Sequence, residues 1–172
     1  RDVSLTVGSD WRPNDSSVRL TVGGDFMGSG WFRFGDHEVE CQTFSANEGR
    51  LEQRVAVTEK PKGFGNHAIA SDGWLLNCYD LSKGPGTQFL KDMMTSSSDH
   101  RGATGPTIFQ LGFGIEFVGE EKCTVGAGTF DALHFRIVAP ELPEDHPPYD
   151  MWCTADGDYI LLKGAVTGYM MT

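Results

Sequence analysis

Alternation of apolar and polar residues runs through most of this chain. In residues 38–44, Val39, Cys41 and Thr43 share one side, while the residues between them are polar. Residues 51–58 alternate in the same way. Because successive side chains of a β-strand point to opposite faces, this period of two predicts strands with one buried and one solvated face.

Short segments of the same kind recur along the chain. The segment 26–34 is aromatic and is interrupted by Gly28 and Gly30, which predicts a bent or bulged strand. The other predicted strands or extended segments are 3–7, 18–22, 67–70, 74–81, 115–123, 129–138, 149–154, 159–166 and the start of one at 169–172.

One segment has a helical pattern instead. Residues 87–95 place Phe89, Leu90, Met93 and Met94 on one stripe, with Thr87 as a plausible N-cap. Polar loops are predicted at 96–106 and, because of its prolines, at 141–148.

Consecutive strands joined by short turns form an antiparallel meander, and a long meander tends to curl because an open sheet leaves exposed edges. We therefore expect a mostly β fold: one domain over residues 1–172, curled into a barrel or half-barrel of lipocalin-like or lipoprotein-carrier-like form. It would contain one short helix and an interior for a small apolar molecule.

Composition narrows the range of partners. The 172 residues carry a formal net charge of −10, which disfavours nucleic acid and anionic lipid as partners. No apolar run is long enough for a transmembrane helix. The four cysteines are far apart and form no CxxC pair, so we expect reduced thiols. No signal peptide is visible, which favours a cytoplasmic protein, although the chain begins at Arg1 and an upstream segment could have been removed.

The C-terminal half carries a family resemblance. The run FVGEEKCTVGAGTFDALHFR from Phe117 to Arg136 is followed by Asp150, Met151 and Trp152 and then by residues 159–163. This order resembles an uncharacterised bacterial domain family that pairs a G-E-x…V-x-A-G-T-F-D turn with a later W…L…K hairpin. The resemblance implies the open β-barrel of periplasmic lipoprotein carriers, wrapped around a helix and an apolar cavity. It covers about a third of the chain, implies no reaction, and leaves 100–106 outside the shared pattern.

Histidine is the side chain best suited to proton transfer near neutral pH, and His100 is the first candidate. Asp99, His100 and Arg101 stand together in the loop after the predicted helix, where they could combine an acid–base group with an anion-binding group. The alternative is a solvated loop in which Asp99 and Arg101 pair locally.

His134 is the second candidate. Alternation places Ala132, His134 and Arg136 on one face of a strand, and Leu133, Phe135 and Ile137 on the other. If the His134 face lines the interior, it marks a site, because an imidazole and a guanidinium are costly to bury without partners. Otherwise both side chains are exterior.

Asp150 shares a strand face with Trp152, so a carboxylate beside an indole could act as an acid or base. The alternative is an outward carboxylate. We predict catalytic roles for His100, His134 and Asp150, with Arg101 stabilising an anion. The residues predicted to contact a ligand are Trp74, Trp152, His67, Arg136, Tyr149 and Phe117.

No HExxH, GxSxG, Walker A or GxGxxG motif is present, and no Cys and His cluster predicts a metal. The leading hypothesis is a small lyase, isomerase or hydratase that uses His and Asp on a hydrophobic or aromatic molecule, without an organic cofactor. The alternatives are a carrier of a hydrophobic ligand, a haem-binding barrel with one axial His, and an interaction module that uses a sheet edge. The oligomeric state stays open, a homodimer included.

Overall fold

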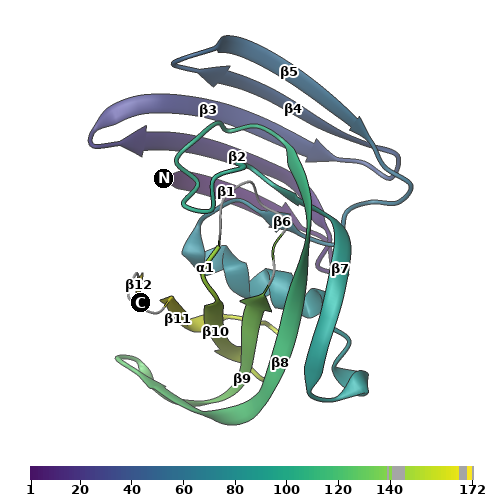
Figure 1. Cartoon of the computed structure of the whole chain (residues 1–172), viewed down its shortest axis with the longest axis vertical. Helices are drawn as coiled ribbons and strands as arrows, with labels where there is room; N and C mark the ends of the chain where they lie inside the picture. The colour runs from purple at the N-terminus through teal and green to yellow at the C-terminus, as the bar shows by residue number, and fades with distance from the viewer. Residues whose placement is uncertain (139, 141–145, 167–169, 172) are drawn as a thin grey trace. The chain divides into compact units, whose positions relative to one another are not determined.

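A computed structural model gives the structure of the chain (Figure 1), and it describes residues 1–138, 140, 146–166 and 170–171. The fold is mostly β, as the sequence predicts. Its strands are β1 (Asp2–Val7), β2 (Pro13–Val22), β3 (Asp25–Phe34), β4 (Glu38–Ser45), β5 (Gly49–Ala56), β6 (Phe64–Gly65), β7 (Gly86–Thr95), β8 (Phe109–Val125), β9 (Gly128–Val138), β10 (Tyr149–Thr154), β11 (Leu161–Val166) and β12 (Met170–Met171). One short helix, α1 (Ile69–Asp72), and two 3-10 turns, η1 (Gly73–Cys78) and η2 (Leu81–Lys83), complete the described elements.

The chain divides into two compact units, which are described separately. The first contains residues Arg1–Ala68 and Asp92–Leu111, and the second contains Ile69–Lys91 and most of the chain from Gly112 onward. Strands β7 and β8 contribute residues to both units. The expectation of one domain remains a prediction.

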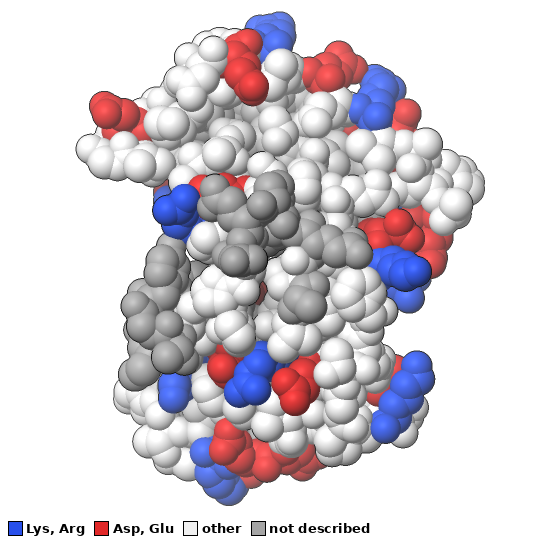
Figure 2. Space-filling view, viewed as in Figure 1, with Lys and Arg blue, Asp and Glu red and all other residues white. Residues whose placement is uncertain are grey.

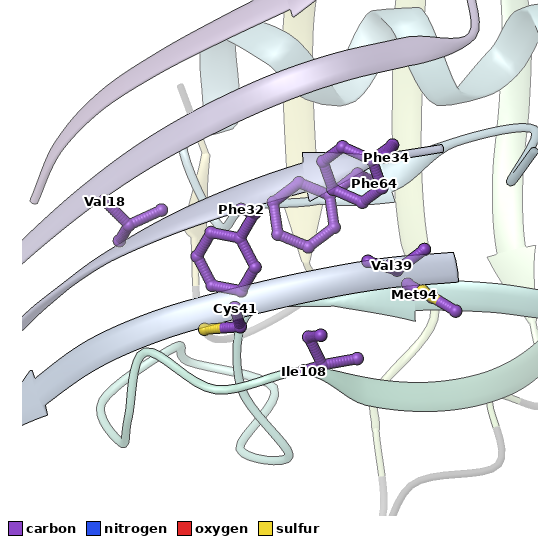
Figure 3. Packing of buried hydrophobic residues seen from close by; sticks show 8 residues of the cluster. All are labelled: Val18, Phe32, Phe34, Val39, Cys41, Phe64, Met94 and Ile108. Carbon is purple, nitrogen blue, oxygen red and sulfur yellow. The ribbon is translucent and has the colours of Figure 1, made fainter. Parts of the chain in front are cut away.

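A five-stranded antiparallel meander, β1-β2-β3-β4-β5, forms the first sheet. Alternate residues of β2, β3 and β4 are buried, and five of them join Phe64, Met94 and Ile108 from outside this sheet in the core cluster of the first unit (Figure 3): Val18, Phe32, Phe34, Val39 and Cys41. The ring of Phe64 lies 4.9 Å from that of Phe32 and 4.8 Å from that of Phe34. The alternation seen in the sequence therefore marks the buried face correctly.

Gly28 and Gly30 lie under the loop that contains Pro106. A Cβ atom at Gly30 would come within 2.9 Å of Pro106 Cγ, and one at Gly28 within 2.7 Å of the Gly105 carbonyl oxygen. The register of β2 against β3 shifts between Leu20 and Thr21, which gives the bulge that the sequence predicts. The glycines themselves serve close packing against the loop.

The second sheet has the order β12-β11-β10-β9-β8-β7-β6, and its strands are strongly curved into a half-barrel. The pairs from β8 to β12 are antiparallel, while β6 and β7 are parallel. In the second unit, the rings of Phe117 and Phe135 lie 5.0 Å apart, and Tyr79 packs on both. These aromatic rings form the buried side of β8 and β9.

Three predicted elements are wrong. Residues 87–95 form a strand within β7 rather than a helix. Residues 74–78 belong to the 3-10 turn η1 and Leu81 begins η2, so 74–81 is not a strand. The segment 67–70 is not extended either, because Ile69 and Ala70 begin the helix α1. Asp92 has a φ of 59°, which breaks the alternation and lets Met93 and Met94 both be buried. Such an interruption produces the spacing of a helical stripe inside a strand, and nine residues are too few to form a stable helix alone.

Further predictions can be checked directly. All four cysteines are free, in agreement with the expected thiols. Residues 96–106 form a loop, as predicted, whereas residues 141–145 of the proline-rich segment lie outside the described part, as do 169 and 172 of the last predicted strand. Among the described residues, no helix has the length and hydropathy needed to cross a bilayer.

Candidate functional site

The two faces of β9 differ sharply in burial. Leu133, Phe135 and Ile137 are buried against the aromatic core of the second unit, with Phe135 fully inaccessible. His134 and Arg136 point to the opposite face, where they are partly exposed. Of the two orientations that the alternation allowed, the structure has the one in which the imidazole points away from the core and the apolar residues point into it.

The register of β9 with β10 brings the predicted residues together. His134 lies opposite Trp152, and Arg136 lies opposite Asp150. Directly opposed residues share a face and have Cβ atoms about 5 Å apart. Four residues predicted from two separate strands therefore form one cluster. We call it the His134 cluster, and its members are His134, Arg136, Asp150 and Trp152.

Both ring nitrogens of His134 face carboxylate oxygens. Nε2 lies 2.8 Å from Oδ1 of Asp150, and Nδ1 lies 3.2 Å from Oε1 of Glu121. The two carboxylates differ in exposure, because the Asp150 side chain is 18% exposed and the Glu121 side chain 51%. Asp150 is thus a fixed partner of the imidazole, while Glu121 faces solvent.

Arg136 fixes Asp150 in turn. Its Nε and Nη2 atoms lie 3.0 and 2.9 Å from the same Oδ1 atom that faces His134. This hydrogen bond and the charge of Asp150 raise the pKa of Arg136. Its Nη1 atom also lies 3.6 Å from Glu116. Charge-assisted hydrogen bonds of this kind are strong and directional, so they orient the carboxylate.

Trp152 covers the imidazole. Its ring stacks on that of His134 at 4.2 Å between centroids, with an interplanar angle of 19°. Its Nε1 atom donates to Glu121 at 2.5 Å, and the Nζ atom of Lys163 lies 4.5 Å from its ring centroid. The indole therefore keeps the imidazole 14% exposed and holds the acidic and basic neighbours around it.

A β-bulge in β8 lies beside His134. The register against β9 shifts between Phe117 and Gly119, so that Gly119 is opposite His134 and Val118 is 43% exposed. Gly119 has a φ of 151°, and a Cβ atom there would meet nothing within 4 Å. Bulges are frequent beside active sites because they redirect side chains. Here the bulge leaves open space over Gly119, the residue opposite His134 in the register.

His67, another predicted ligand residue, belongs to the first unit. Its Nδ1 atom lies 3.2 Å from Ser96 Oγ, which also accepts a hydrogen bond from Arg1 Nη1 at 2.9 Å. Arg1 further donates to the carbonyl oxygens of Asn66 and Gly102. Burial lowers the pKa of Arg1, against the opposing effect of the Asp99 charge. These contacts fasten the loop 96–106 to the strand end at Gly65, so their evident role is structural.

His100 and Arg101 lie in the same loop. Asp99 accepts hydrogen bonds from the backbone and the guanidinium of Arg101, at 2.9 and 3.2 Å. Burial opposes the charge of Asp99, but these bonds more than offset it and lower the pKa. His100 Nδ1 lies 3.9 Å from the same carboxylate. Because this loop belongs to the first unit and the His134 cluster to the second, the predicted catalytic residues form two separate groups.

The remaining predicted residues lie within the second unit. Phe117 is part of its core, and Trp74 lies in η1, where its carbonyl oxygen accepts from Asn77. The Tyr149 hydroxyl donates to Asp72 Oδ2 at 3.1 Å. Burial raises the pKa of Asp72 to about 7, although this hydrogen bond acts in the opposite direction. Burial and the charge of Asp72 also raise the pKa of Tyr149.

Sequence reasoning missed Glu121, Lys163 and Glu116. Glu116 and Lys163 lie on strands with a readable alternation, and their positions opposite Arg136 and Trp152 follow from the registers. Glu121 reaches His134 only because the bulge shifts the register, and nothing in a single sequence predicts that shift.

Charges of both signs alternate over the visible surface, with Lys and Arg side chains beside Asp and Glu (Figure 2). Within the described residues, no group of three or more His, Cys, Asp or Glu side chains has the arrangement of a metal site. No protein-family model, curated protein or solved structure matches the chain.

Proposed function

We propose that the protein is a small acid–base enzyme of the lyase or isomerase type, in which His134 moves a proton on a planar, largely apolar substrate. The observation that carries this proposal is the contact of 2.8 Å between His134 Nε2 and Asp150 Oδ1, with Arg136 on the same oxygen. A carboxylate that is itself held by a guanidinium orients an imidazole and stabilises its protonated form.

The proposal gives the two ring nitrogens different roles. A neutral imidazole has one N–H, and we place it on Nε2 because the contact with Asp150, at 2.8 Å, is shorter than the contact of Nδ1 with the exposed Glu121, at 3.2 Å. Nδ1 then carries the lone pair that accepts a proton. Glu121 is the exposed neighbour of Nδ1, and a substrate would take its place.

The surroundings suit a planar substrate from which a carbon-bound proton is removed. Val118 and the edge of Trp152 offer apolar contact next to the open space at Gly119. Lys163 and Arg136 supply positive charge for an oxyanion that develops as the proton leaves. This reaction needs no organic cofactor.

The probe that tests this proposal is 5-nitrobenzisoxazole. A base removes its ring C–H proton, the electron pair forms the nitrile, and the N–O bond breaks to release a coloured phenolate. We expect the protein to accelerate this reaction, and we expect His134→Gln to lower the rate by at least about tenfold.

His37→Gln is the matched control, because His37 is an exposed imidazole in a turn of the first unit. It should leave the rate unchanged. Equal rates for the wild type and His134→Gln, or equal losses in both variants, would overturn the proposal, since the activity would then belong to surface imidazoles in general.

A further inference from the structure

The solvent-facing side of the five-stranded sheet carries three exposed aromatic side chains. Trp31 is 40% exposed, Phe44 52% and Phe26 37%. They lie on β3 and β4, and we call them the aromatic patch. Single exposed apolar residues are common on protein surfaces, but a group of large aromatic rings on one sheet face marks a binding surface.

The register explains how the patch is arranged. Trp31 lies opposite Gln42, and Phe44, two residues further along β4, lies opposite Ser29. The rings of Phe26 and Phe44 stack at 6.3 Å with an interplanar angle of 20°. Trp31 and Phe26 lie opposite Ser17 and Thr21, four positions apart on β2, so the patch extends for about 13 Å at the usual rise of a strand. It is therefore an elongated platform rather than a pocket.

Polar side chains surround the rings. Ser17 and Gln42 flank Trp31 on the neighbouring strands, and Ser29 lies next to Phe44. In the described part of the chain, these three side chains make no hydrogen bond to another residue, so their donors and acceptors face solvent. Hydrogen-bonding groups thus lie beside Trp31 and Phe44, although Phe26 and Phe44 stack directly on each other, and such a mixed surface is unlike the apolar core of a protein interface.

Charges on this face largely cancel. Arg33 pairs with Glu40 at 2.6 Å, Arg54 pairs with Glu40 at 2.7 Å, and Arg19 pairs with Asp2 at 3.6 Å. A polyanion needs a row of unpaired cations, and the chain as a whole carries a charge of −10. The charge balance therefore favours a neutral ligand over nucleic acid or an anionic membrane.

We propose that the aromatic patch binds a neutral polysaccharide chain, with pyranose rings stacked on Trp31 and Phe44. A pyranose ring presents C–H groups on its faces and hydroxyl groups at its edge. The C–H groups suit the electron-rich face of an indole or phenyl ring, and the hydroxyls suit Ser17, Ser29 and Gln42. An extended chain of such rings matches an elongated platform, and an open surface gives weak binding.

The test is isothermal titration calorimetry of the whole chain with cellohexaose, maltohexaose and chitohexaose. We expect one of these to bind with a Kd of about 0.1 to 1 mM. Trp31→Ala should weaken binding by about tenfold or more, while Trp31→Tyr, which keeps a stacking ring, should stay within about threefold of the wild type. Because Trp31 is exposed, neither variant removes core packing.

Phe89→Ala is the matched control, because Phe89 is 48% exposed but lies in the second unit. It should bind as the wild type does. Absence of binding to all three sugars, or equal binding by Trp31→Ala, would overturn the proposal. So would a dimer in sedimentation that Trp31→Ala dissociates, or tighter binding to oligothymidylate, because the patch would then serve a second copy or a nucleic acid. The His134 assay reports on other residues, so the two proposals fail independently.

Discussion

His134 and Asp150 stand 16 residues apart in the chain, yet His134 Nε2 and Asp150 Oδ1 are 2.8 Å apart on adjacent strands. The pair lies on the face of the sheet that turns away from the aromatic core. Its geometry therefore comes from strand pairing and from Arg136, and burial in an apolar interior contributes little.

Removing the carboxylate tests the role of this pair. Asp150→Asn keeps the shape but weakens the acceptor of both His134 and Arg136. We expect a fall of about tenfold in the 5-nitrobenzisoxazole rate and a loss of about 1 kcal/mol in the free energy of unfolding. Enzyme kinetics measure the rate, and urea unfolding measures the free energy of unfolding. Asp131→Asn, on the neighbouring strand β9 and 77% exposed, should change neither; a loss as large in that variant would contradict the assignment.

The raised pKa of Asp72 predicts that the stability of the protein depends on pH. Its folded-state pKa, about 7, exceeds its ordinary value of 3.8, so the fold favours the protonated carboxyl. The stabilisation is complete below about pH 4 and is lost as the pH rises to about 7. Asp72→Asn should remove this dependence, so that the variant gains about 4 kcal/mol relative to the wild type between pH 4 and 8.

Urea unfolding at a series of pH values measures the effect, with the exposed Asp36→Asn as the control. Parallel stability profiles for the wild type and Asp72→Asn would mean that the carboxyl is ionised in the fold.

The close packing at Gly30 predicts a steric effect. Gly30→Ala would place a methyl group 2.9 Å from Pro106 Cγ and 3.0 Å from Thr43 Oγ1. We expect a loss of about 1 to 3 kcal/mol, measured by thermal or urea unfolding. Ser29→Ala, at the adjacent exposed position, should stay within about 0.5 kcal/mol of the wild type. A neutral Gly30→Ala would show that the loop does not pack on β3.

Phe135 anchors the core of the second unit. It is fully buried, and its ring contacts those of Phe117 and Tyr79. Phe135→Leu should destabilise the protein by about 1 to 2 kcal/mol and Phe135→Ala by about 3 to 5 kcal/mol. Chemical denaturation followed by circular dichroism measures both, and the exposed Phe89→Ala should have little effect. A larger loss of stability in Phe89→Ala than in Phe135→Ala would place Phe135 outside the core.

The thiols give a chemical test of the packing. Cys41 and Cys153 are fully buried, and burial raises the pKa of each to about 12. Both should therefore react slowly with a thiol reagent in the native protein, and the partly exposed Cys78 faster. In denaturant without reductant, all four thiols should react, and a count of two or fewer would reveal disulfides.

The alternation of residues 38–44 and 129–138 was sufficient to predict strands and to divide their side chains between two faces, although for 129–138 it left open which face is buried. This works because the period of two is a property of the extended backbone itself and needs no knowledge of the neighbouring strands. The same local reasoning mistook residues 87–95 for a helix, because the backbone turn at Asp92 changes which residues are buried.

The sequence by itself determined the β class, the two faces of the regularly alternating strands and the candidates His134, Arg136, Asp150 and Trp152. Only the tertiary structure decided that these four share a surface face, that Glu121 and Lys163 join them, and that His100 and Arg101 belong to another unit. The reason is that strand register, and the bulge that shifts it at Gly119, arise from pairing between distant segments. A local pattern shows which side chains of a strand share a face, but it does not show which strand lies beside it in the sheet.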